Sequence, residues 1–352
     1  MQSNILCEIL DDWDDILYSF PKIFQDIYFT KKYLKLYESD KEKALCLFCH
    51  EKDKIMLFPF LRRKIADYFD FETAYGYGGP VSNTAEVDWN QRAFGTMHDY
   101  LKEHDYLCGF TRFHPLLSNE CFVRNKNHCS DEDCIQILYD RQTIAIDTSK
   151  GEDDIWNNQI HSKNRNMIRK AEKNYLEYKA EYDFASYSEF INLYLSTMSR
   201  LSADSFYFFD NDYFEKIKAN FRGASFLGTV RFEGKLICAA IFLYSEKYGH
   251  YHLEGSDRNY SNLGANNFLL WKTACEMCKL GIHEFHLGGG TNSSLDNPLF
   301  KFKKSFSKNE KQFFIGKQIF DLNQYNKICQ NWEEHNPDKT GSYRNILLKY
   351  RY

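Results

Sequence analysis

The sequence predicts an α/β protein made of two similar domains, each with a mixed β-sheet. The chain has 352 residues, which is long for a single hydrophobic core. Its composition, 43% hydrophobic and 27% charged with only six prolines, is typical of a globular protein. One order of strands and helices is written in both halves of the chain. We therefore expect one domain in residues 1–150 and a second in residues 151–352.

The second half shows this order most clearly. Three predicted strands joined by tight turns precede a helix and a fourth strand, at residues 225–232, 236–244, 250–254, 266–280 and 283–287. Gly281 follows the apolar helix pattern and is suited to end the helix. A strand, a helix and a second strand in this order form a crossover between neighbouring strands.

The first half repeats the same order with different residues. Its predicted strands and helix lie at residues 44–50, 54–60, 71–81, 86–104 and 106–113. A hairpin-like pair follows each set: 134–140 with 141–147, and 311–316 with 317–321. The repetition predicts a tandem duplication.

Charge and hydropathy limit the classes of function. The formal net charge is −4 and the sequence pI is near 6.3, so any contact with nucleic acid must be local. The N-terminal residues lack the basic segment of a signal peptide, and no apolar run approaches the roughly 20 residues that span a bilayer. We expect a cytoplasmic protein.

The 11 cysteines are odd in number, and many lie in apolar runs, so buried free thiols are expected. Two C-x-x-C pairs, Cys46 with Cys49 and Cys275 with Cys278, could in principle form a four-thiolate zinc site. Their positions in a predicted strand and a predicted helix argue against it, because zinc pairs usually occupy tight turns. His128, Cys129 and Cys134 are expected to lie in a surface loop.

Three segments could support chemistry. In the glycine loop before the predicted helix, Gly264, Ala265 and Asn266 open the helix and Arg258 could add positive charge for a phosphate. In LFKFKKSF (299–306), an extended segment would separate aromatic from lysine side chains, and a lysine ammonium can stabilise an oxyanion. An ordinary capped helix and a solvated strand face are the alternatives.

The third segment, residues 161–174, places Arg165, Arg169 and Lys173 on one helix face. This face suits a phosphate-bearing ligand, either a nucleotide diphosphate or an RNA backbone, although a solvated face is the alternative. On the predicted strand 250–254, His252 and Glu254 share one face and Tyr251 lies on the other. These groups are candidates to bind substrate or accept a proton.

These motifs resemble the Fem-type branch of the GNAT acyltransferase superfamily, which includes the peptidoglycan-bridge aminoacyltransferases. The resemblance rests on four segments: RNMIRKAEKN (165–174), YHLEGSD (251–257) with LGANNFLLW (263–271), HLGGG (286–290), and LFKFKKSF. It implies two GNAT-like domains, no metal and no tightly bound cofactor. It also implies an aminoacyl-tRNA donor and an amine acceptor on a lipid- or nucleotide-linked cell-envelope precursor.

The resemblance also implies roles for individual residues. Lys303, preceded by Phe302, would lie near the ester at the tRNA 3′ end, and Tyr251 would contact the acceptor. Arg165 and Arg169 would lie near phosphates of the donor or acceptor. Ser305 stands where the family has glycine.

The sequence therefore predicts an acyltransferase in which an amine attacks an activated aminoacyl or other acyl group directly. An acyl-CoA-dependent N-acyltransferase is the alternative, although GNAT enzymes grip coenzyme A with a Q/R-x-x-G-x-G/A pattern of which only Gly264 remains. A non-catalytic module that binds carbohydrate or peptide is the second alternative. Peripheral association with a membrane is possible for a lipid-linked acceptor.

Overall fold

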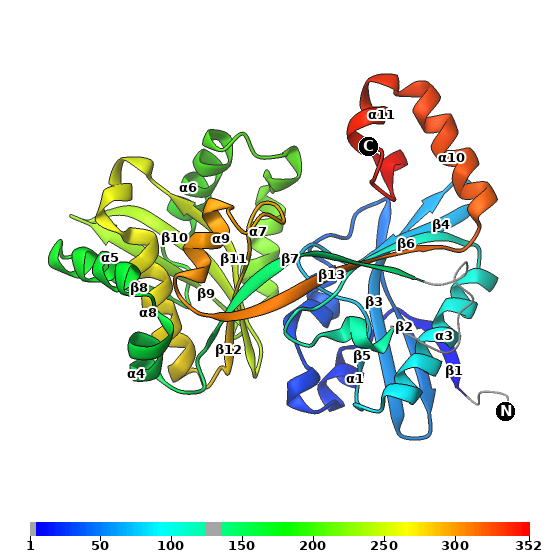
Figure 1. Ribbon diagram of the computed structural model, residues 1–352, viewed down its shortest axis with the longest axis horizontal. Coiled ribbons are helices and arrows are strands. Elements are labelled where there is room, and N and C mark those ends of the chain that lie inside the picture. Colours follow the sequence, from blue (N-terminus) through cyan, green and yellow to red (C-terminus); the bar gives the residue numbers. More distant parts are fainter. Residues whose placement is uncertain (1–4, 124–134) are drawn as a thin grey trace. The chain divides into compact units, whose positions relative to one another are not determined.

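The computed structural model describes residues 5–123 and 135–352 (Figure 1). The chain divides into two compact units. Unit 1 comprises Met1–Phe24, Tyr28–Asp140 and Gln312–Tyr352, and unit 2 comprises Gln25–Ile27 and Arg141–Lys311.

Unit 1 is built on a sheet with the strand order β1-β2-β3-β4-β6-β13. These strands are β1 (Leu6–Leu10), β2 (Glu42–Glu51), β3 (Lys54–Ile65), β4 (Tyr68–Glu72), β6 (Tyr106–Arg112) and β13 (Asn309–Ile319), and β5 (Val81–Ser82) pairs with β3. The α-helices of this unit are α1 (Asp14–Ser19), α2 (Lys31–Leu34), α3 (Val87–Glu103), α10 (Leu322–His335) and α11 (Pro337–Tyr343).

Unit 2 is built on a sheet with the strand order β7-β12-β11-β10-β9-β8. These strands are β7 (Gln136–Asp147), β8 (Glu177–Glu181), β9 (Ser225–Phe232), β10 (Lys235–Tyr244), β11 (Tyr248–Ser256) and β12 (Glu284–Gly289). Its α-helices are α4 (Glu152–Asp154), α5 (Ser162–Lys173), α6 (Tyr187–Arg200), α7 (Asn211–Asn220), α8 (Ala265–Lys279) and α9 (Pro298–Lys304).

The two sheets share one topology, so the predicted tandem duplication is confirmed. In unit 1 the antiparallel strands β1 to β4 lead through α3 to β6, which is parallel to β4. In unit 2 the antiparallel strands β8 to β11 lead through α8 to β12, which is parallel to β11. The last strand of each sheet is exchanged: β13 pairs with β6 in unit 1, and β7 pairs with β12 in unit 2.

This exchange corrects the predicted hairpins and places the boundary between units differently from the expected one. Residues 136–147 form one uninterrupted strand, and residues 309–319 form another. A Cβ at Gly316 would lie 2.5 Å from the Ile135 side chain, so close packing accounts for this glycine within the strand. Residues 312–352 consequently belong to unit 1. The predicted strand 71–81 also ends early, at Glu72.

Each unit has its own hydrophobic core. In unit 2, apolar residues of β9, β10 and β12 pack against α5, α8 and α9, with Ile168, Leu269 and Phe300 among the buried side chains. In unit 1, residues of β2, β3 and α3 form the core together with Phe314 and Phe320 from the C-terminal segment. No helix within residues 5–123 and 135–352 has the length and apolar character needed to cross a membrane.

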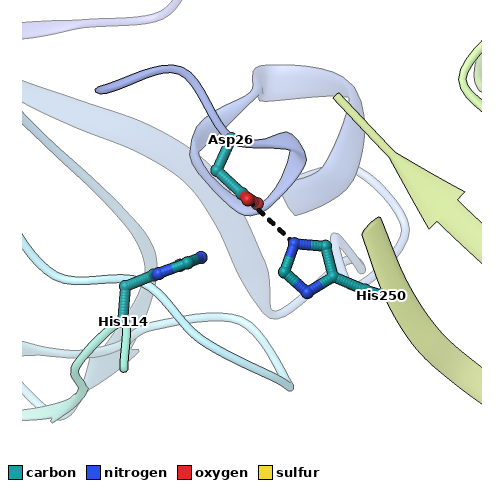
Figure 2. Close-up of side chains that lie close together, drawn as sticks. All are labelled: Asp26, His114 and His250. Atoms are coloured by element: carbon teal, nitrogen blue, oxygen red, sulfur yellow. Dashed lines mark hydrogen bonds and ion pairs between the residues drawn. The ribbon is translucent and has the colours of Figure 1, made fainter. Parts of the chain in front are cut away.

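A short segment of the N-terminal region belongs to unit 2 and contacts it through a buried pair of polar side chains. The carboxylate of Asp26 lies 2.8 Å from Nε2 of His250 on β11, and both side chains are almost fully buried (Figure 2). The hydroxyl of Ser245 also donates to the carbonyl oxygen of Gln25. These contacts attach residues 25–27 to the β10–β11 region.

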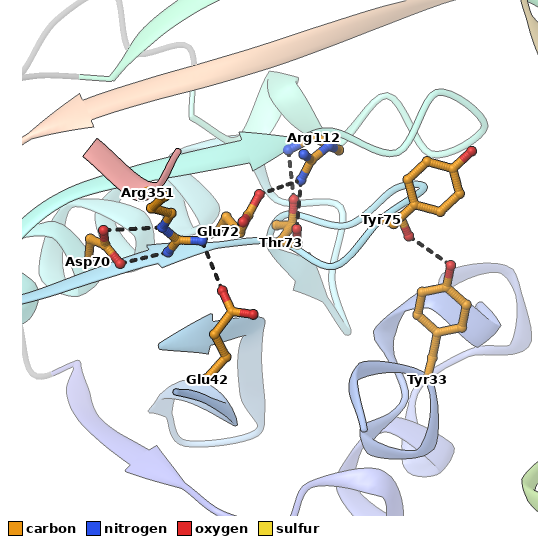
Figure 3. A network of polar contacts seen from close by, with 8 residues as sticks. All are labelled: Tyr33, Glu42, Asp70, Glu72, Thr73, Tyr75, Arg112 and Arg351. Carbon is orange, nitrogen blue, oxygen red and sulfur yellow. Dashed lines mark hydrogen bonds and ion pairs between the residues drawn. The ribbon is translucent and has the colours of Figure 1, made fainter. Parts of the chain in front are cut away.

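The C-terminal segment covers one face of β6 through Leu347 and Leu348. Arg351 then reaches three carboxylates of unit 1 (Figure 3). Its guanidinium donates to both oxygens of Asp70, at 2.6 and 3.2 Å, to Glu42 at 3.0 Å, and to Glu72. Such a bidentate pair is among the stronger hydrogen-bonded arrangements in proteins.

Candidate active site

The candidate site lies where two parallel strands of unit 2 separate. Within the described chain, β11 and β12 pair over three positions, Tyr248–His250 with Glu284–His286. Immediately beyond, each strand has a bulge against its other neighbour: His252 in β11 and Leu287 in β12. A bulge bends its strand and increases the twist, so the two strands diverge at this point.

Helix α9 brings Lys303 to this divergence. The sequence suggested an extended segment, but residues 299–304 are helical, because Asn297 caps the helix and Pro298 occupies its first turn. The Asn297 side chain accepts the backbone N–H groups of Leu299 and Phe300, at 3.0 and 3.1 Å. Helical spacing turns Phe300 and Lys303 inward together.

The neighbouring lysines of α9 point outward. Lys301 pairs with Asp296 at 2.8 Å, and Lys304 pairs with Glu310 at 2.6 Å. Lys303 is therefore the lysine of this helix whose side chain is buried, with 8% of its surface exposed. Phe302 is half-buried beside it and packs edge-to-face on Phe306.

The ammonium group of Lys303 contacts both strands. Its Nζ donates to the carbonyl oxygen of Gly289 at the end of β12, at 2.8 Å. On the β11 side, the ring of Tyr251 lies 5.7 Å from Nζ, within the range of a cation–π contact. Burial lowers the pKa of Lys303 to about 8, while Glu254 acts to raise it and Arg141 to lower it.

The bulge at His252 changes which side chains of β11 share a face. Opposite β10, Tyr251 aligns with Phe242 and Glu254 with Ala240, and both partners belong to the core beneath α8 and α9. Tyr251 and Glu254 thus lie on one face. The predicted grouping of His252 with Glu254 is wrong, because strict alternation does not hold across a bulge.

Glu254 is held firmly on this face. It accepts hydrogen bonds from Nδ2 of Asn266 at 3.1 Å and from the Cys238 thiol at 3.7 Å. Burial raises the pKa of its carboxyl group despite these bonds. His252 instead meets the hydroxyl of Tyr213 at 2.8 Å, and burial, with a smaller effect of His250, lowers the pKa of His252 to about 3.

Arg141 is a residue of the site that sequence reasoning missed. Its guanidinium donates to the carbonyl oxygen of Gly290 at 2.7 Å, next to the carbonyl that holds Lys303. A Cβ at Gly289 would lie 2.8 Å from the backbone oxygen of Gln142, so the glycines allow β7 to approach closely. Arg141 follows an acidic residue in an ordinary strand pattern, which gives no signal of this role.

The start of α8 is covered by α5. Gly264 has φ +78°, and a Cβ there would lie 2.7 Å from the backbone oxygen of Met167 in α5. Asn267 donates to Asn164 of α5 at 2.6 Å. Ala265 is buried in this contact region. Helix packing therefore accounts for the glycine without a ligand.

Other predicted residues have varied surroundings. Arg165 donates to the carbonyl oxygens of Trp156 and Ile160, at 2.9 and 2.7 Å, and so closes the preceding turn. Arg169 is exposed, with its guanidinium 5.3 Å from the Trp156 ring. Arg258 is exposed in the short helical turn Arg258–Leu263.

Six of the described cysteines are buried free thiols, as predicted: Cys46, Cys49, Cys108, Cys238, Cys275 and Cys329. Cys7 and Cys278 are half-buried, and Cys121 is exposed. Cys46 and Cys49 lie in β2, where three-residue spacing directs their side chains to opposite faces. A zinc site that needs both is therefore disfavoured. Cys275 and Cys278 lie on α8. His128, Cys129 and Cys134 lie outside the described residues.

Comparison with known proteins agrees with this geometry. Residues 162–304 match the family model described as an acetyltransferase (GNAT) domain, so this part of unit 2 is similar to that domain. A search of curated proteins found no match. The overall fold resembles that of FemX, with a TM-score of 0.66 and 14% identity, over 92% of this chain and 98% of that chain.

Two further solved structures share the fold. One is a conserved protein of unknown function from Bacteroides thetaiotaomicron, with a TM-score of 0.56 and 12% identity, over 89% of this chain and 100% of that chain. The other is the C-terminal domain of a putative lysylphosphatidylglycerol synthetase from Agrobacterium fabrum. Its TM-score is 0.54 and its identity 13%, over 89% of this chain and 92% of that chain. Together with FemX, these structures confirm the fold that the predicted resemblance implied.

Proposed function

We propose that the protein transfers an aminoacyl group from aminoacyl-tRNA to an amine on a nucleotide- or lipid-linked cell-envelope precursor. The observation that carries this proposal is the buried ammonium of Lys303 at the divergence of β11 and β12. A positive charge held there, away from bulk water, can stabilise the oxyanion that develops on an attacked ester.

The reaction needs no covalent intermediate on the protein. The acceptor amine attacks the ester carbonyl, an amide bond forms, and the ester C–O bond breaks. The proton lost by the amine is taken up by the leaving 3′ oxygen. Cys238 is the thiol beside Glu254, and burial raises its pKa well above the ordinary value. It stays protonated and is a poor nucleophile. Proximity of the two bound substrates supplies much of the rate.

The covered start of α8 supports tRNA over coenzyme A as the donor. A helix N-terminus binds pyrophosphate through open backbone N–H groups, but here α5 packs on Gly264 and the side chains of Asn266 and Asn267 bond within the protein. The match to a family described as acetyltransferases favours a second candidate, an acyl-CoA-dependent N-acyltransferase.

A transfer assay with two donors tests the proposal. The protein is incubated with a nucleotide-linked muropeptide that carries a free amine, and with either a pool of tRNA charged with radioactive amino acids or radioactive acetyl-CoA. We expect label in the acceptor only with charged tRNA. Label only from acetyl-CoA would establish the second candidate, and no transfer from either donor would favour a binding module.

Matched lysine variants connect this activity to the site. Lys303→Met removes the buried ammonium and should lower the transfer rate by about 100-fold or more, the usual effect of losing an oxyanion donor. Lys301→Met removes an exposed lysine of the same helix that pairs with Asp296, so it should retain the rate. Equal losses in both variants would contradict the role of Lys303.

A further inference from the structure

Unit 1 contains a pair of thiols that lie far apart in the sequence but close together in the sheet. Cys7 on the edge strand β1 lies directly opposite Cys49 on β2 in the antiparallel register. Directly opposed residues of antiparallel strands have Cα atoms about 4.5–5.5 Å apart, within the 4.4–6.8 Å range of disulfides. The C-x-x-C partner of Cys49, Cys46, points to the other face of β2.

The two sulfur atoms share one environment. Cys49 is fully buried in the core of unit 1, and Cys7 is a half-buried residue that packs against the same core. Burial raises the pKa of the Cys49 thiol, and its hydrogen bond with Cys7 raises it further. Cys49 is thus a protonated thiol already in contact with the sulfur of Cys7.

Cys7 is also reached from outside. Cys7 is only partly buried and lies on β1, the outermost strand of the sheet, so a small oxidant can reach its side chain. The partly exposed Cys7 can therefore react with an oxidant first, and the buried Cys49 can then react with Cys7.

We propose that Cys7 and Cys49 form a redox modification site at which a small hydroperoxide produces a cross-strand disulfide. The thiol of Cys7 first gives its proton to water, and the sulfur then attacks the peroxide O–O bond and takes one oxygen as sulfenic acid. The displaced hydroxide or alkoxide takes a proton back from water and leaves as water, from hydrogen peroxide, or as an alcohol, from an organic hydroperoxide. The Cys49 thiol then attacks the Cys7 sulfur. The S–S bond forms, the S–O bond breaks, and the hydroxyl leaves as water with the Cys49 proton.

The disulfide has a structural consequence. It joins β1 to β2 covalently and closes the chain between residues 7 and 49, which lowers the entropy of the unfolded state. The oxidised protein should therefore unfold at a temperature several degrees higher than the reduced protein, and dithiothreitol should reverse the shift.

Peptide mapping tests the proposal directly. The reduced full-length protein is treated with hydrogen peroxide, quenched with catalase, alkylated with iodoacetamide and digested without reduction. Mass spectrometry should find the peptides of Cys7 and Cys49 joined and two hydrogens lighter than the separate thiols. A link from Cys49 to Cys46, or oxidation of Cys7 to sulfinic acid without a link to Cys49, would overturn the proposal.

Single variants separate the two steps. Cys49→Ser should leave Cys7 as a sulfenic acid that dimedone traps, whereas Cys46→Ser should form the disulfide as readily as the native protein. Cys7→Ser changes a half-buried residue of an edge strand and should leave Cys49 reduced and the thermal shift absent. If Cys49 in that variant is still oxidised at the native rate, Cys7 is not the reacting thiol and the proposal fails.

Discussion

The ammonium group of Lys303 donates a hydrogen bond to the carbonyl oxygen of Gly289, 2.8 Å away. The contact joins α9 to the last residue of β12, at the point where β11 and β12 have diverged. Gly289 therefore fixes the position of the charge, between the two strands that bend at their bulges.

The pH dependence of transfer should report the charge on Lys303. Burial lowers its pKa to about 8, so the ammonium is present below this pH and is lost as pH rises through it. The rate should rise with deprotonation of the acceptor amine and then fall above about pH 8. Initial rates between pH 6 and 10 measure this profile.

A substitution that retains the charge provides the control for this profile. In Lys303→Arg the guanidinium stays protonated over the whole range, so the decline above about pH 8 should disappear even if the rate is lower. A decline unchanged in this variant would assign the titration to another group.

Two neighbouring charges should shift this titration in opposite directions. Glu254 raises the pKa of Lys303 and Arg141 lowers it. Glu254→Gln should therefore move the decline below about pH 8, and Arg141→Gln should move it above. NMR of the Lys303 Cε in protein labelled with ¹³C-lysine measures the same pKa without turnover. Glu284→Gln is the control, because Glu284 pairs with Lys311, 2.7 Å away.

The close packing of α5 on α8 predicts a difference between two glycines. Gly264 and Gly281 both have positive φ, 78° and 72°, but a Cβ at Gly281 meets no atom within 4 Å. Gly281→Ala should lower the free energy of unfolding by about 1 kcal/mol, the cost of the left-handed backbone. Gly264→Ala should lower the free energy of unfolding by the same amount and by roughly 1–3 kcal/mol more, because its Cβ would collide with the Met167 carbonyl.

Urea unfolding compares these two variants. Similar losses of stability would show that α5 moves away from Gly264 at little cost. In that case the start of α8 is also accessible to a phosphate, which would strengthen the case for coenzyme A.

Removal of Arg351 should destabilise unit 1. Arg351→Ala leaves Asp70, which is fully buried, without the guanidinium that contacts both of its oxygens. The loss of one partner of a buried pair costs roughly 3–5 kcal/mol. Arg344→Ala changes an exposed arginine of the same segment and should alter stability by no more than about 0.5 kcal/mol. Urea unfolding followed by tryptophan fluorescence measures both variants, and equal effects would contradict the role of Arg351.

Much of the fold could be predicted because strand and helix periodicity is local. The crossovers around α3 and α8 and the repeated order follow from hydrophobic spacing and turn residues. The exchange of β7 and β13 could not be predicted, because a long strand that passes between two units carries the same local pattern as a hairpin without its turn. Gly316 lies within such a strand, where its small size leaves room for the Ile135 side chain.

The sequence singled out Lys303, Tyr251 and Glu254, and the structure places these residues near one another in unit 2. Their roles in catalysis and binding stay predictions. Their shared face depends on a bulge at His252, and no residue type marks a bulge reliably. Arg141 enters the site only because β7 is the closing strand of unit 2.

The exchanged strand β13 also determines when unit 1 can mature during synthesis. Translation runs from the N-terminus toward the C-terminus, yet the sheet of unit 1 lacks its last strand, and its core lacks Phe314 and Phe320, until residues 309–320 have emerged. N-terminal domains usually fold first as they are made. Here the N-terminal unit must wait for the C-terminal residues, and the nascent chain exposes the edge of β6 in the interval.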